Sequence, residues 1–147
     1  ERVLVEPCLR EAGGVPRDPP WFLGSDVGGA FAEYLTVASR HAHRVESPLS
    51  DAELATFPCS YSTAENMLVR ARIGAGERVL VTGASGGVGS AAVQLARARG
   101  AEVLALSTPE KADALIALGA AEVLPRGLVG EDLRARLERV IDEAEVW

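Results

Sequence analysis

The sequence predicts an α/β fold in which a β region precedes part of a doubly wound parallel sheet, and residues 78–107 carry most of this prediction. The unbroken apolar run at residues 79–81 is typical of a parallel strand that helices cover on both faces. A glycine-rich loop follows it, then apolar residues at helical spacing, Gly100 as a helix end, and a second apolar run at residues 103–106. This order predicts a βαβ unit.

The loop between the first strand and the helix reads GASGGVG. Glycines permit a tight turn, a close approach of the backbone to a ligand, and close packing of the helix on the strand. The helix directs its free N–H groups and its positive dipole end at the loop, which favours a pyrophosphate. A turn that only packs the helix would explain the glycines but not their position. The predicted cofactor-binding residues in the loop are Gly83, Ala84, Ser85, Gly86, Gly87 and Gly89, with Ala84 where the usual fingerprint has its first glycine.

Length and charge limit the functional classes. The 147 residues suffice for one domain, or for one domain and part of another. A net charge of −6 with scattered arginines argues against a nucleic-acid partner. The absence of a long apolar run and of an N-terminal leader predicts a cytoplasmic protein without a membrane partner. Cys8 and Cys59 are too few for a disulfide scaffold.

The first third of the chain predicts a β region. Residues 2–5 read as a strand that opens abruptly, as if the chain were cut there. Residues 9–29 are rich in glycine and proline and predict a long loop, whereas residues 31–37 alternate as a half-buried strand does. His41 and His43 lie two apart, but arginines flank them, so we expect a solvated surface rather than a metal site.

Two helices should precede the βαβ unit. Ser50 and Glu53 form a capping box at the start of a short helix that Pro58 interrupts. A second helix is expected at residues 62–73, with an apolar stripe for core packing, and Gly74 should end it.

Further elements should follow the βαβ unit. Thr108 is expected to cap a helix that starts at Pro109 and stops at Gly119. A third strand is expected at residues 122–124 and an amphipathic helix at about residues 131–143.

These features resemble the medium-chain dehydrogenase/reductase superfamily, which contains zinc-type alcohol dehydrogenases and quinone oxidoreductases. Residues 29–34, GAFAEY, look like the strand that leaves the family's GroES-like catalytic domain, and residues 76–89 look like its first Rossmann strand and loop. The resemblance covers most of the chain. It implies a partial GroES-like segment at 1–48, linking helices at 49–75 and a partial Rossmann domain at 76–147.

The resemblance also implies roles for single residues. Cys59 matches a ligand of the catalytic zinc, and Thr63 and Val88 match residues that pack on the nicotinamide. The family's earlier cysteine, its Gly-His-Glu segment and its structural zinc lobe are absent from this sequence. Zinc is therefore expected only through the full-length parent.

The short-chain dehydrogenases are a competing family, because residues 82–89 also fit their glycine pattern. That family would bring a Tyr-x-x-x-Lys pair downstream. Tyr34 and Tyr61 are the two tyrosines, and the residues four places beyond them are alanine and glutamate. The medium-chain family therefore fits better.

The resemblance implies an NAD(P)(H)-dependent oxidoreductase that transfers hydride between the cofactor and a carbonyl, alcohol, quinone or enone. NADP(H) is favoured over NAD(H), because Ser107 stands where NAD-preferring sites place a carboxylate. Ser107 and Thr108 could donate to a 2′-phosphate, and Lys111 matches a basic position of NADP-dependent relatives. The alternative is a truncated nucleotide-binding module without catalysis, and we expect the chain alone to be inactive.

The expected partners follow from the same fold. A small-molecule substrate is implied by the family. The central strand at residues 79–81 would lack its neighbour, strand four of the usual order 3-2-1-4-5-6. An unpaired apolar edge predicts self-association or missing chain segments.

Overall fold

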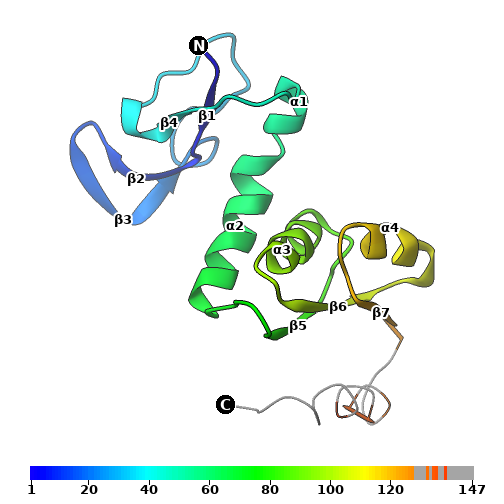
Figure 1. The fold of residues 1–147 in the computed structure, drawn as a ribbon. Helices are drawn as coiled ribbons and strands as arrows, with labels where there is room; N and C mark the ends of the chain where they lie inside the picture. Colours follow the sequence, from blue (N-terminus) through cyan, green and yellow to red (C-terminus); the bar gives the residue numbers. More distant parts are fainter. Residues whose placement is uncertain (128–131, 133, 136–137, 139–147) are drawn as a thin grey trace. The chain divides into compact units, whose positions relative to one another are not determined.

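The computed structural model describes residues 1–127, 132, 134–135 and 138, and the chain divides into two compact units, Glu1–Cys59 and Ser60–Trp147 (Figure 1). We call them unit 1 and unit 2. Unit 1 holds two small antiparallel sheets, and unit 2 holds a parallel sheet of three strands.

The sheet of unit 2 confirms the α/β prediction. Its strands β5 (Arg78–Val81), β6 (Glu102–Ser107) and β7 (Glu122–Pro125) are parallel and lie in the order β5-β6-β7. The helices α3 (Gly87–Ala98) and α4 (Ala112–Ala117) connect consecutive strands and lie on the same side of the sheet in Figure 1. This is half of a doubly wound sheet, and β5 lies at the edge where the other half of such a sheet would continue.

Small side chains explain how closely α3 packs on the sheet. Ala91, Val93 and Ala96 are completely buried, as are Val103 and Ala105 of β6. Apolar residues at helical spacing on one element and a continuous apolar run on the other bury both surfaces together.

Gly100 ends α3 as the sequence predicts. Its φ is +83°, in the left-handed region that favours glycine. The Gly100 amide donates to the carbonyl of Arg97 at 2.9 Å, and the Ala101 amide donates to that of Ala96 at 3.1 Å. This pair of bonds is a Schellman motif, which satisfies the last helical carbonyls and turns the chain into β6.

The helix α2 (Phe57–Arg70) corrects two predictions. Pro58 does not interrupt it, because proline in the first turn lacks only an amide that has no partner there. The helix also ends before Gly74: Arg72 takes a left-handed φ of +57°, and the Ile73 amide donates to the Leu68 carbonyl at 3.0 Å. A non-glycine residue therefore supplies the helix end.

The segment after β6 differs in detail from the prediction. Pro109 begins a 3₁₀ turn (Pro109–Lys111), and α4 follows it from Ala112. Thr108 precedes this turn but makes no side-chain capping bond to its backbone. The predicted third strand is present as β7, and the helix predicted at about 131–143 lies mostly outside the described residues.

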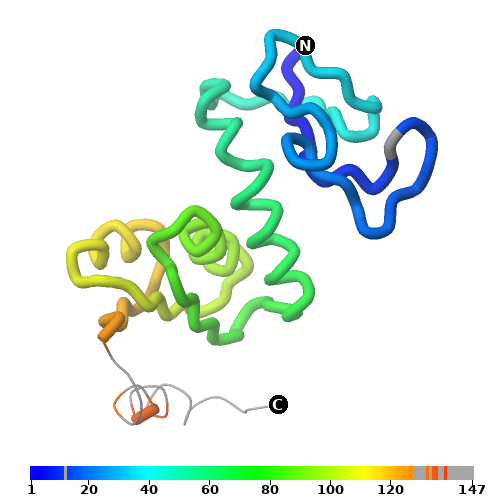
Figure 2. Tube along the Cα trace, turned by 180° about the vertical axis from the view of Figure 1, so that it is seen from behind, coloured from blue at the N-terminus to red at the C-terminus, as the bar shows by residue number. Residues whose placement is uncertain are grey.

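Unit 1 contains a hairpin where the sequence predicted a loop at residues 9–29. β2 (Cys8–Ala12) and β3 (Val15–Phe22) pair antiparallel, and Figure 2 shows them as a long blue excursion of the trace. Gly13 and Gly14 have φ of +61° and +78°, as the two central residues of a tight hairpin turn require. The loop prediction is wrong here because a two-stranded ribbon tolerates prolines, since each strand has a free edge.

The strand predicted at residues 31–37 is also wrong. This segment has no strand or helix, and the side chains of Phe31 and Tyr34 are exposed. Alternation of apolar and polar residues stabilises a strand only where a second strand supplies hydrogen bonds and a face to pack on. None of the strands in the described part of the chain pairs with it.

The second sheet of unit 1 combines the strand predicted at residues 2–5 with a strand that was not predicted, β4 (Ala42–Arg44). β1 (Val3–Val5) pairs antiparallel with β4. His41 lies just before β4 and is 4% exposed, so the predicted solvated surface is wrong for this residue. The Glu6 carboxylate lies 3.4 Å from the His41 Nδ1 and gives this buried ring one polar partner.

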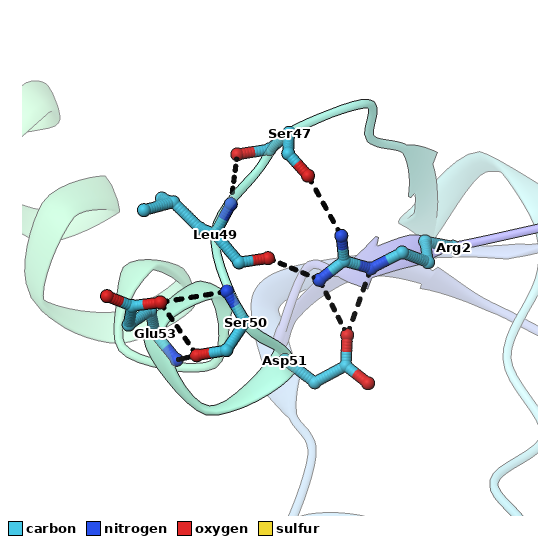
Figure 3. A network of polar contacts seen from close by, with 6 residues as sticks. All are labelled: Arg2, Ser47, Leu49, Ser50, Asp51 and Glu53. Atoms are coloured by element: carbon cyan, nitrogen blue, oxygen red, sulfur yellow. Dashed lines mark hydrogen bonds and ion pairs between the residues drawn. The ribbon is translucent and has the colours of Figure 1, made fainter.

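The helix α1 (Asp51–Leu54) begins with the predicted capping box. The Ser50 Oγ accepts from the Glu53 amide at 3.3 Å, and the Glu53 carboxylate accepts from the Ser50 amide at 2.8 Å (Figure 3). The Ser50 hydroxyl also donates to the Glu53 Oε2 at 2.7 Å, and this bond, followed by the one from the Ser50 amide, holds the pKa of Glu53 below the ordinary glutamate value.

Arg2 joins the first strand to the turn before α1. Its guanidinium donates to the Asp51 Oδ1 at 2.7 and 2.9 Å, and to the carbonyls of Ser47 at 3.0 Å and Leu49 at 2.6 Å (Figure 3). One side chain thus connects the two ends of unit 1's sequence through four hydrogen bonds.

Candidate functional site

The glycine loop, residues 82–86, leaves the carboxyl end of β5 and leads into α3. Gly83 has a φ of +61°, and its carbonyl accepts from the Gly86 amide at 2.9 Å. The Ala84 amide donates to the Leu106 carbonyl at 3.4 Å, which ties the loop to the end of β6. The loop therefore lies at the edge of the sheet where parallel strands end and where ligands bind in open α/β sheets.

The glycines of the GASGGVG segment, which spans the loop and the first turn of α3, have different steric roles. A Cβ on Gly89 would lie 2.3 Å from the Gly83 carbonyl oxygen, so only glycine lets α3 pack under the loop. A Cβ on Gly86 would have one close neighbour, the same oxygen at 3.3 Å, and would otherwise meet open space. Gly89 is thus a packing residue, whereas the missing side chain of Gly86 leaves room above the loop.

The first turn of α3 presents backbone amides to this space. The first helical hydrogen bond runs from the Ser90 amide to the Gly86 carbonyl at 2.8 Å. The amides of Gly87, Val88 and Gly89 precede it and have no acceptor within the helix. With the helix dipole they form an anion-binding end, and the exposed surface of Gly86 and Gly87 keeps it open.

Three further predicted residues of the GASGGVG segment differ in their burial. Ala84 is completely buried in the core of unit 2, so its side chain packs inward while its backbone shapes the loop. Ser85 is exposed. Val88 is half-buried and packs against the edge of the same core. Alanine in place of the first glycine is therefore compatible with the fold.

The residues predicted to choose the cofactor follow β6. Lys111 is exposed and Thr108 half-buried, but Ser107 is completely buried and its Oγ has no hydrogen-bond partner within the described residues. Glu110 is fully exposed, and a hydrogen bond from the Thr108 hydroxyl, followed by smaller contributions that include Lys111, lowers its pKa. The position thus combines one cation, one ionised carboxylate and two hydroxyls.

The two predicted residues of α2 are both exposed. These are Cys59, the expected zinc ligand, and Thr63, the expected neighbour of the nicotinamide. Over residues 1–127 and the four other described positions, no group of three or more His, Cys, Asp or Glu side chains could hold a metal ion. A catalytic zinc takes three protein ligands, so the described residues do not form a catalytic zinc site.

Two contacts between α2 and α3 escaped the sequence prediction. The Gln94 Nε2 donates to the Tyr61 Oη at 2.9 Å, and the Ser60 Oγ lies 2.7 Å from where a Cβ on Gly87 would stand. Neither pair has a spacing that marks it in the sequence, since the partners lie on separate helices. They place the start of α2 against the first turns of α3.

Two cavities differ in their relation to these residues. A cavity of about 410 Å³ in unit 2 is lined by apolar side chains of α2, β5 and α3 together with Gly83, Gly86 and Gly89. A larger one of about 670 Å³ lies in unit 1, and none of the predicted site residues lines it. The apolar cavity of unit 2 therefore borders both the loop and the first turn of α3.

Sequence relatives of the chain include multidomain synthases and small oxidoreductases. No protein-family model matches it. Erythronolide synthase EryA2 from Saccharopolyspora erythraea is 48% identical over 92 residues, 62% of this chain and 3% of the relative. Human quinone oxidoreductase is 38% identical over 114 residues, 77% of this chain and 35% of the relative. The chain thus spans about a third of that oxidoreductase.

Solved structures similar to the chain are oxidoreductases as well. The quinone oxidoreductase from Thermus thermophilus, studied also in complex with NADPH, matches with a TM-score of 0.66 and 38% identity over 78% of this chain and 43% of its own. Other neighbours include alcohol dehydrogenases and an enoyl reductase. The described residues show no helix long and apolar enough to cross a membrane.

Proposed function

The chain matches the medium-chain dehydrogenase/reductase superfamily over part of that family's length, and on this premise we propose that it holds a nicotinamide cofactor for an oxidoreductase. The reaction is a hydride transfer between NADP(H) and a carbonyl, alcohol, quinone or enone. The bound cofactor supplies the hydride chemistry, while the protein binds and orients it.

One observation carries this proposal: the open first turn of α3 beside the glycine loop. The amides of Gly87, Val88 and Gly89 can donate to the pyrophosphate, and the missing side chain of Gly86 admits it. Val88 and Thr63 are proposed to pack on the nicotinamide.

The cofactor preference is proposed to depend on the end of β6. Lys111 would donate to a 2′-phosphate, and so would the Thr108 hydroxyl on turning from the Glu110 carboxylate to the phosphate. The Ser107 hydroxyl is completely buried and would have to become accessible to join them. Glu110 opposes this preference, because a glutamate carboxylate is charged at neutral pH, and the bond from the Thr108 hydroxyl lowers its pKa further. We therefore propose NADP(H) over NAD(H), with Lys111 supplying most of the selectivity.

The Lys111→Ala variant tests the cofactor preference. Loss of a charge-assisted hydrogen bond should weaken NADPH binding by about tenfold to a hundredfold, with little effect on NADH. Parallel calorimetric titrations of both cofactors measure this. Arg70→Ala is the matched control, because it removes the same charge from an exposed position on α2. Tighter NADH binding by the parent chain, or equal discrimination by both variants, would refute the proposed preference.

A second candidate is a nucleotide-binding module without turnover. The chain spans only part of its relatives' length, and among the described residues no group of three or more His, Cys, Asp or Glu side chains could hold a metal ion. A turnover assay with NADPH and quinones or aldehydes separates the two. A rate above background excludes the module, and binding without turnover supports it.

The remaining assignments are proposals of the same kind. The division at residues 48 and 75, a cytoplasmic location and the absence of nucleic-acid and membrane partners are proposed from the sequence.

Within the described residues β5 pairs only with β6, and Leu80 is exposed. We propose that this edge self-associates or receives further chain segments, and light scattering tests the first possibility: a stable monomer at high micromolar concentration would exclude it.

A further inference from the structure

Ser60 of α2 closely approaches the first residue of α3, which follows the glycine loop. An added Cβ on Gly87 would lie 2.7 Å from the Ser60 Oγ but 3.7 Å from its Cβ. The hydroxyl therefore points at the start of α3, and the rest of the serine stands at ordinary contact distance. Both residues belong to unit 2.

The Ser60 hydroxyl differs from neighbouring hydroxyls in what it bonds. The Thr56 Oγ1 donates to the Glu53 carbonyl at 2.7 Å, and the Ser90 Oγ donates to the Gly87 carbonyl at 3.1 Å. Each of these hydroxyls donates to a backbone carbonyl three residues earlier in the chain, as serine and threonine commonly do. Ser60 is half-buried, and its hydroxyl has no such bond within the described residues. Its donor is available at the place where α3 presents amides.

We propose that the Ser60 hydroxyl is a further ligand of the cofactor's pyrophosphate, donating a hydrogen bond to it from α2 beside the α3 amides. This inference rests on the proposed function. A phosphate oxygen only accepts, whereas a hydroxyl can donate, and a bond to a charged acceptor is about twice as strong as one between neutral groups. Gly87 has no side chain, so nothing of its own stands between the hydroxyl and the ligand.

The competing explanation is that Ser60 is merely a small residue that fits against Gly87. Both explanations predict that Gly87→Ala disturbs the contact, and that Ser60→Ala relieves it, because the two Cβ positions are 3.7 Å apart. They differ in what Ser60→Ala alone does to ligand binding. Only a phosphate ligand requires the oxygen atom.

The test measures the binding of two fragments by the whole chain. ADP-ribose contains the pyrophosphate, and adenosine 2′-monophosphate contains only the 2′-phosphate. Ser60→Ala should weaken ADP-ribose binding about tenfold, as expected for one hydrogen bond to a charged group, and leave the 2′-monophosphate unchanged. Lys111→Ala should do the reverse. Ser62→Ala, two residues further along α2, is the control and should change neither.

The outcomes separate the two proposals. If the parent chain binds ADP-ribose and Ser60→Ala binds it equally well, the role of Ser60 is refuted while the proposed function stands. If the parent chain binds neither fragment, the proposed function fails and the role of Ser60 fails with it. Thermal unfolding of each variant confirms that it is folded. The stability of Gly87→Ala with and without Ser60→Ala tests the contact itself: no relief in the double variant would overturn the geometry.

Discussion

The two units of the molecule are stabilised by different kinds of interaction. In unit 2, α3, β6 and the loop bury a continuous cluster of alanine, valine and leucine side chains. In unit 1, the described residues bury only Leu9, Leu54 and His41 to a comparable degree, and its strands belong to two separate pairs. Unit 1 instead depends on polar contacts such as those of Arg2 and Ser50.

This difference shows why the candidate site lies in unit 2. Binding amides have to be held in place before the ligand arrives, and a close-packed core does this better than exposed polar contacts. Apolar burial also contributes more per residue than surface ion pairs do. Substitutions in the core of unit 2 should therefore have larger effects than any in unit 1, and they should reach the site.

Gly89→Val should have the largest effect. Its Cβ would lie 2.3 Å from the Gly83 oxygen and 2.7 Å from the Ala84 Cα, and backbone atoms cannot move aside cheaply. We expect a loss of at least about 3 kcal/mol, or failure of unit 2 to fold. Thermal unfolding followed by circular dichroism measures it. Gly127→Val is the control, because a Cβ there meets nothing within 4 Å. Equal stability of the two variants would show that α3 does not pack as described.

Gly86→Val should separate binding from folding. Its backbone angles, φ −82° and ψ 170°, suit any residue, and its one close neighbour is the Gly83 oxygen at 3.3 Å. We expect a largely unchanged circular dichroism spectrum and a loss of ADP-ribose affinity of more than about a hundredfold, because the branched side chain occupies the phosphate space. A variant that keeps both its spectrum and its affinity would show that the phosphates bind elsewhere.

The units also differ in how well their structure could be predicted from sequence. The strand at residues 79–81, the loop and the helix end at Gly100 depend on neighbours within one βαβ unit, and they were predicted correctly. The hairpin at residues 8–22, the strand β4 and the irregular segment 31–37 depend on which strands pair, which local patterns do not specify.

The site shows the same division. The loop residues were predicted from their spacing together with the apolar run before them and the helical pattern after them. The contacts of Ser60 with Gly87 and of Tyr61 with Gln94 form only when α2 packs on α3. The burial of Ser107 depends on its place in the sheet. Such contacts leave no periodic signal in the sequence.

In unit 1, Arg2→Ala should be the most damaging polar substitution. It removes the ion pair with Asp51 and two bonds to backbone carbonyls, but the side chain is 40% exposed, so we expect about 1 kcal/mol. Urea unfolding followed by the fluorescence of Trp21, in a Trp147→Phe background that leaves it the sole tryptophan, reports on this unit. Arg44→Ala is the control, since the Arg44 guanidinium pairs with the carboxylates of Glu46 and Glu1. An equal loss in both would mean that the carbonyl bonds contribute nothing.

Ser50→Ala should have the smallest effect, and that effect should depend on pH. Hydrogen bonds from Ser50 lower the pKa of Glu53 in the folded chain, so the unfolded chain binds the proton more tightly. The stabilisation is therefore fully present above the unfolded value of about 4.3 and is lost as the pH falls through the lower folded value.

The difference in urea midpoint between the parent chain and Ser50→Ala should accordingly be constant from pH 7 to about pH 5 and shrink at lower pH, as the Glu53 carboxylate is protonated and the capping box weakens. Thr56→Ala provides the matched control on the same segment, because its hydroxyl donates to the Glu53 carbonyl, which does not titrate. Its effect should not follow the protonation of Glu53. If the Ser50→Ala difference instead persists unchanged to pH 3, the serine acts through its bond to the Glu53 amide alone, and the carboxylate contributes nothing to the start of α1.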